Sequence, residues 1–212
     1  MTSADFILGV PPHARPVAPI DADHMSVYEL TIEERTAFGV RVRDGRLVPL
    51  DEDRLTELYT ATHDALVGAG FEHYEISSYA QPGQRAVHNS LYWRGAAFLG
   101  LGVGAASLEL MPDGGGVRRT NPRRAHAYFA GGEGDVVRAT ASELACERAW
   151  LGMRMRDGVA EDDLAPAHGV AHWLVEDGLA ARHGAQICPT LRGFLFADRI
   201  AARIVQSWGD KV

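Results

Sequence analysis

The chain has 212 residues, of which 46% are hydrophobic and 23% charged, a composition typical of a soluble globular protein with one large domain or two small ones. Its net charge of -7 argues against a nucleic-acid partner held by general electrostatics. The two cysteines, Cys146 and Cys188, exclude a four-cysteine zinc site, the usual ligand set of a [4Fe–4S] cluster and a disulfide framework, so a cytoplasmic, reducing compartment is expected. The N-terminal apolar run is short and carries Asp5, unlike a signal peptide, and no stretch is long enough to span a membrane.

The first 80 residues favour strands, with one long helix between them. The expected elements are a buried strand from Asp5 to Pro11, a strand from His24 to Glu33, a helix from Asp51 to about Val67 and a strand over 71–80. The prolines between residues 11 and 22 exclude a helix interior in that link. Asp5 on its own has the pattern of a capping or exposed residue before a strand.

A histidine, an amide and two aromatic residues stand together in the run H-N-S-L-Y-W-R-G, which begins at His88. His88 and Tyr92 are four residues apart, as are Asn89 and Trp93, so a helical turn would place each pair on one side. The alternating glycines at 100, 102 and 104 predict a strand with one bare face, open to another backbone or to a flat ligand. Spacing alone favours a packed corner with Trp93 in the core over a ligand site. A dinucleotide site is weaker still, because the third glycine of that motif is missing.

Four arginines, at 118, 119, 123 and 124, follow a glycine-rich stretch with no acid among them. Guanidinium groups bind carboxylates bidentately, as in a propionate, but a solvated loop is the favoured interpretation. The dipeptide Asn121-Pro122 predicts the start of a helix that runs to Phe129.

Residues 139–212 predict a second, smaller domain, which begins with a capping box between Thr140 and Glu143. Its expected elements are a helix from Thr140, a short helix near 161–167, a helix over 170–177, a hairpin over 179–187 and a last helix over 190–208. Helices followed by a hairpin suggest a winged-helix architecture. The 10 acids against 8 Lys/Arg in this region argue against DNA binding.

Four segments together resemble the HemW heme chaperones, which are grouped with oxygen-independent coproporphyrinogen III oxidases among the radical SAM proteins. The segments are D-F-I-L-G-V-P, H-M-S-V-Y-E-L-T-I-E, H-N-S-L-Y-W-R-G and the C-terminal L-V-E-D-G-L. The resemblance implies an α/β fold with two parts. Residues 1–138 would be the C-terminal part of a radical SAM β/α barrel, and 139–212 a small winged-helix-like α+β domain.

The same resemblance implies two binding sites. Heme would be bound by His88, Asn89, Tyr92 and Trp93, with His88 as the ligand of the iron. S-adenosylmethionine would be held by Asp5 and Ile7, and His24 would lie at the ligand-facing end of the barrel. The family's C-x-x-x-C-x-x-C loop, which ligates a [4Fe–4S] cluster, is absent from this sequence.

The expected function is heme binding and trafficking by a truncated HemW-like protein that cannot perform radical SAM chemistry alone. Two alternatives stay open: a fragment of an oxygen-independent coproporphyrinogen III oxidase, and an inert remnant or interaction module. Whether the chain is an enzyme is therefore undecided. The expected partners are heme or a porphyrin, a separately encoded front half of the barrel, or a heme-acceptor protein.

Overall fold

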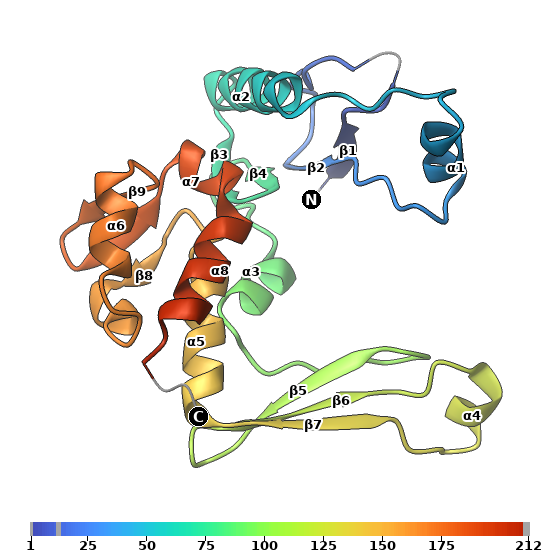
Figure 1. Ribbon diagram of the computed structural model, residues 1–212, viewed down its shortest axis with the longest axis vertical. Coiled ribbons are helices and arrows are strands. Elements are labelled where there is room, and N and C mark those ends of the chain that lie inside the picture. The colour runs from blue at the N-terminus through green and yellow to red at the C-terminus, as the bar shows by residue number, and fades with distance from the viewer. Residues whose placement is uncertain (1, 12–13, 210–212) are drawn as a thin grey trace. The chain divides into compact units, whose positions relative to one another are not determined.

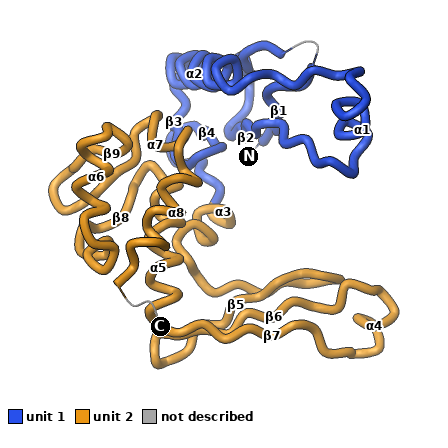
Figure 2. The backbone as a smooth tube through the Cα atoms, viewed as in Figure 1, with its two compact units in different colours: residues 1–86 blue, residues 87–212 orange. Residues whose placement is uncertain are grey.

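The computed structural model describes residues 2–11 and 14–209 (Figure 1). The chain forms two compact units, residues 1–86 and 87–212 (Figure 2). The predicted domain boundary at 138/139 falls inside the second unit. That the region after this boundary folds on its own stays a prediction. No helix among the described residues is long and apolar enough to cross a membrane.

The first unit is built on a four-stranded sheet in the order β1-β2-β4-β3. Its strands are β1 (Ser3–Leu8), β2 (His24–Glu29), β3 (Glu72–Glu75) and β4 (Ser78–Ala80). β1 and β2 are parallel, and the other two pairings are antiparallel. The described part of the proline-rich link between β1 and β2 contains no helix, as predicted.

The strand predicted over 71–80 is instead a hairpin of β3 and β4. The chain turns at Ile76 and Ser77, where the Ser77 amide donates to the carboxylate of Glu75 over 3.4 Å and Tyr59 donates to the Ile76 carbonyl over 2.9 Å. Local bonds of this kind compete with a continuous extended backbone.

Two helices accompany this sheet, α1 (Ala37–Arg43) and α2 (Glu52–Gly68). The prediction of α2 is confirmed: the Asp51 side chain caps it by accepting from the Arg54 amide over 2.7 Å. Its buried side packs toward β1 and β3 and consists of Leu58, Tyr59, Thr62 and Leu66. α1 was not predicted; Thr36 caps it.

The second unit begins with α3 (Val87–Trp93) and a three-stranded antiparallel sheet in the order β5-β6-β7. The strands are β5 (Ala106–Leu110), β6 (Gly116–Thr120) and β7 (Asp135–Ala139), with α4 (Ala125–Phe129) before β7. The prediction of a strand over the alternating glycines is wrong. Gly102 and Gly104 have φ of 99° and 68°, which is the left-handed region and not an extended strand, so the segment is a loop. Helix α4 is shorter than predicted, because it begins after Arg124.

The rest of the second unit packs helices against a small antiparallel sheet in the order β8-β10-β9. Its elements are α5 (Ala141–Gly152), β8 (Val159–Ala160), the 3-10 helix η1 (Glu161–Leu164), α6 (Val170–Glu176), β9 (Ala180–His183), β10 (Gln186–Pro189), α7 (Leu191–Leu195) and α8 (Ala197–Ser207). The capping box of Thr140 and Glu143 and the predicted hairpin are confirmed. The predicted last helix is divided in two at Phe196, whose backbone leaves helical geometry. The core includes Met153, Leu174, Ile187, Ile200 and Ile204.

Candidate functional site

Helix α3 separates the four predicted heme residues into two pairs, as their spacing requires. The rings of His88 and Tyr92 meet edge to face with centroids 4.7 Å apart, and Tyr92 meets Phe98 in the same way at 4.6 Å. His88 is exposed, and neither of its ring nitrogens is hydrogen-bonded to another described residue. An exposed imidazole with both nitrogens available fits the role of an axial ligand of heme iron.

Trp93 lies on the other side of α3, where the helix packs against α5. The guanidinium of Arg154 sits over its indole ring, 5.7 Å from the ring centroid. Trp93 is half-buried and does not belong to the hydrophobic core, so the prediction of Trp93 in the core is wrong. It packs against Arg154 instead. Asn89, one turn earlier on the helix, is half-buried.

The loop that follows α3 is held by its backbone and presents apolar side chains to solvent. Gly100 donates to the Ser107 hydroxyl over 2.9 Å, and the Asn121 amide donates to the carbonyls of Gly100 and Gly102 over 3.2 and 2.9 Å. Leu99 and Leu101 are 78% and 80% exposed. The flat glycine face expected for a ligand is therefore replaced by exposed leucines on a fixed loop.

The arginine cluster is divided between a strand and a loop. Arg118 and Arg119 lie in β6, so the prediction of a solvated loop is wrong for them. Arg118 forms an ion pair with Glu147 of α5 at 2.9 Å. Arg123 and Arg124 precede α4, are exposed, and form no ion pair with another described residue. Arg119 on β6 is exposed as well, so these three arginines are the members of the cluster that are available to an anionic ligand.

The predicted S-adenosylmethionine residues share one face of the sheet in the first unit. In the parallel register Asp5 lies beside Ser26 and Ile7 beside Tyr28. Asp5 is exposed, and Ile7 and Tyr28 are 56% and 44% exposed. This face is exposed at Asp5, Ile7 and Tyr28, where it carries both a carboxylate and apolar surface, but it is buried at Ser26.

His24 lies at the opposite end of β2 from the predicted ligand-facing end. It is the first residue of the strand, and the carboxyl end, where barrels of parallel strands keep their sites, is at Tyr28 and Glu29. Its buried ring lies within 3.1 Å of the Ser3 hydroxyl and 2.9 Å of the Tyr74 hydroxyl. Burial lowers the pKa of His24, and the charge of Asp5 opposes this effect in part. Sequence reasoning missed Tyr74, because no local signal connects it to His24.

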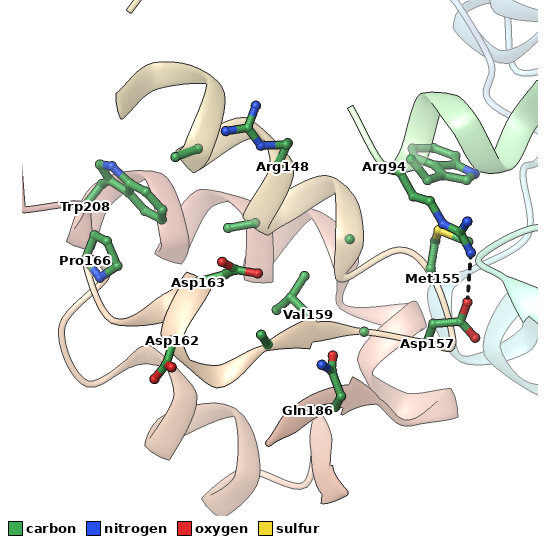
Figure 3. Close-up of a pocket in the computed structure, with 16 residues that line it drawn as sticks. Arg94, Arg148, Met155, Asp157, Val159, Asp162, Asp163, Pro166, Gln186 and Trp208 are labelled. Carbon is green, nitrogen blue, oxygen red and sulfur yellow. Dashed lines mark hydrogen bonds and ion pairs between the residues drawn. The ribbon is translucent and has the colours of Figure 1, made fainter. Parts of the chain in front are cut away.

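A pocket of about 490 Å³ lies in the second unit between α5 and the β8–η1 segment (Figure 3). Its floor contains the buried side chains of Ala149, Met155 and Val159. Its rim carries charges of both signs, and an ion pair between Arg94 and Asp157 at 3.4 Å lies at one end. Trp93 and Arg94 of the H-N-S-L-Y-W-R-G run line this pocket, which sequence reasoning did not foresee.

Metal-ligating side chains do not converge in the described parts of the chain. No group of three or more His, Cys, Asp or Glu residues there could hold a metal ion. Cys146 and Cys188 are free, and burial raises the pKa of both thiols. Two such thiols do not fit the three-cysteine ligand set of a radical SAM cluster, whereas the exposed His88 fits a heme ligand.

Comparisons with known proteins define the class and then the relatives. No protein-family model matches the chain. The structure of coproporphyrinogen III oxidase (HemN) from Escherichia coli, a radical SAM enzyme, superposes with a TM-score of 0.64 at 15% identity, covering 95% of this chain and 54% of that one. The chain therefore has the mixed α/β fold of about half of a radical SAM protein of this type.

Curated sequences identify the relatives more closely. The heme chaperone HemW of Mycobacterium tuberculosis H37Rv is 32% identical over 216 residues, covering 95% of this chain and 54% of that protein. HemW of Escherichia coli K12 is 37% identical over 117 residues, covering 55% of this chain and 30% of that protein. The chain is homologous to the C-terminal portion of the HemW heme chaperones and spans about half of their length or less.

Proposed function

We propose that this chain binds heme and takes part in heme trafficking, with His88 as the axial ligand of the iron. The observation that supports this most directly is the exposed His88–Tyr92 pair on α3, in a chain homologous to heme chaperones. Tyr92 and Asn89 would flank the porphyrin, and Trp93 would stabilise α3 by packing against Arg154. The partial barrel and the winged-helix-like architecture expected from the sequence belong to the same proposal.

The surroundings of His88 suit a large apolar ligand. Val87 and Leu91 on the same helix are 73% and 46% exposed, and Leu99 and Leu101 are exposed on the following loop. Apolar surface of this kind is costly in water and is typical of binding sites. The exposed Arg123 and Arg124 would be available to the heme propionates.

The test is a heme titration of the 212-residue chain and of His88→Ala, followed by the Soret band. We expect the band to shift on binding to the parent and the shift to be lost in His88→Ala. His183→Ala is the matched control, because it removes an exposed imidazole from β9, outside the proposed site. Equal heme affinity and equal spectra for the parent and His88→Ala would remove His88 from the site.

We further propose that Asp5 and Ile7 contact S-adenosylmethionine, supported by their exposure on one face of the sheet, but that this chain alone does not cleave it. Cleavage in radical SAM proteins depends on a cluster held by three thiolates, and the 212 residues contain two cysteines. This also weighs against an oxidase activity of the isolated chain. Anaerobic reconstitution with iron and sulfide should release no 5′-deoxyadenosine; its release would contradict the proposal.

A further inference from the structure

We propose that Arg154, which lies outside the H-N-S-L-Y-W-R-G run, is a positioning residue that fixes α3 and thereby the orientation of His88. The effect on heme binding rests on the proposed heme function. The attachment of α3 by Arg154, called the clamp below, can be tested without heme. Its basis is a set of contacts at the C-terminal end of α3.

Helix α3 cannot hold its own orientation. It has seven residues, none of which is buried. Isolated helices shorter than about 12–15 residues are marginal in water, so tertiary contacts must stabilise this one. Since His88 and Tyr92 are exposed, those contacts come from the other side and from the residues that end the helix.

Arg154 supplies the central contact. Its guanidinium lies between two indole rings, 5.7 Å from the centroid of Trp93 and 5.5 Å from that of Trp150 on α5. Its Nη2 donates to Asp198 of α8 over 2.7 Å, and its side chain is only 21% exposed. Its Nε is buried without a hydrogen-bond partner among the described residues. The two ring faces therefore share this cation with the Asp198 carboxylate, and partial burial strengthens the cation–π contacts.

The two residues after Trp93 reinforce the same attachment. Arg94 pairs with Asp157, beyond the end of α5 (Figure 3). Gly95 lies directly against the stem of Arg148: a Cβ at this position would be 2.6 Å from the Arg148 Cγ. Trp93, Arg94 and Gly95 thus each meet a different residue of the 148–157 region. The first part of the run carries the proposed ligand residues, and the last part attaches α3 to the 148–157 region.

The experiment compares the full 212-residue chain with Arg154→Met, which keeps much of the apolar stem but removes the cation. Arg199→Met is the matched control, because Arg199 also lies over an indole, 5.5 Å from Trp173, and pairs with Asp177 at 3.9 Å, without touching α3. Arg154→Lys is a second variant that keeps the charge but not the planar group. Far-UV circular dichroism verifies that each variant folds.

The first measurement is amide hydrogen exchange of residues 88–95 in the heme-free proteins. We expect exchange in Arg154→Met to be about tenfold faster than in the parent, an intermediate effect in Arg154→Lys and no change in Arg199→Met. Unchanged exchange in Arg154→Met would overturn the clamp, whatever the heme data show.

The second measurement is heme titration of the same proteins. Only the fraction of molecules in which α3 is packed against α5 can bind heme through His88. We therefore expect the heme Kd of Arg154→Met to rise about tenfold and its Soret band to approach that of His88→Ala. Faster exchange with unaltered heme affinity and spectrum would overturn the positioning role. A parent that binds no heme would refute the proposed function and this role with it, while the exchange data would still decide whether Arg154 clamps α3.

Discussion

The buried His24 should make the stability of the first unit depend on pH in a predictable direction. His24 is 3% exposed, and its ring nitrogens lie within hydrogen-bonding distance of the hydroxyls of Ser3 and Tyr74. Burial lowers its pKa below the usual 6.5. As the pH falls, the unfolded chain therefore takes up a proton at a higher pH than the native state does. The contribution of the neutral His24 to the free energy of unfolding is thus fully present above pH 6.5 and is lost as the pH falls toward the pKa of the folded state.

The size of the effect follows from proton linkage. A group that is protonated only in the unfolded state removes about 1.4 kcal/mol per pH unit from the free energy of unfolding. Between pH 7.5 and 5.5 His24 should therefore remove up to about 1.4 kcal/mol, and most of that loss falls below pH 6.5. His24→Gln keeps a polar side chain but does not titrate, so its stability should vary less over the same range.

The assay is urea unfolding at half-unit steps between pH 5.5 and 7.5, followed by far-UV circular dichroism. The molecule has an internal control, because all four tryptophans lie between residues 93 and 208 in the second unit. Tryptophan emission should therefore give the same pH dependence in the parent and in His24→Gln. Equal pH slopes of the dichroism transition in the two proteins would refute the reasoning about His24.

Other expectations concern the second unit. Thr140→Ala removes the capping box of α5 and should lower the free energy of unfolding by about 1 kcal/mol, measured by urea titration of tryptophan emission. Gly158→Ala should lower it by at least about 2 kcal/mol, because φ is +66° and a Cβ would lie 2.1 Å from the Ile187 carbonyl; a loss below 1 kcal/mol would contradict this. Ile187→Ala should cost about 2–5 kcal/mol, against less than about 0.5 for the half-exposed Val205→Ala. Limited proteolysis should leave a stable fragment that begins near 135–140, and uniform digestion across 140–209 would contradict that boundary.

Local signals were sufficient to place the starts of three helices. Asp51, Thr140 and Thr190 were recognised as caps, and in each case the side chain accepts from a backbone amide three residues later. The i, i+4 pairing of His88 and Tyr92 was likewise predictable, because helical geometry alone determines it. Such features depend on a few neighbouring residues.

The missed features depend on distant residues or lack a periodic pattern. Tyr74, which contacts His24, is 50 residues away in the chain. The alternating glycines read as a strand, yet a Cβ at Gly100 would lie 2.0 Å from the Ala106 carbonyl, a constraint that only the folded loop reveals. Strand β7 was missed because Val136 and Val137 are both exposed, so neither face of the strand is marked by burial.

The two larger sheets should also differ in how fast they form. In the sheet β5-β6-β7 the strands pair in chain order through antiparallel neighbours, so its contacts are mostly local. In the sheet β1-β2-β4-β3, Met25 must find Tyr79, and β1 must align in parallel with β2. Because closing a longer loop carries a larger entropic penalty and slows folding, the first unit should complete its sheet after the second has formed its own. During synthesis on the ribosome, the N-terminal strands emerge first but must wait for residues 72–80 before their sheet can close.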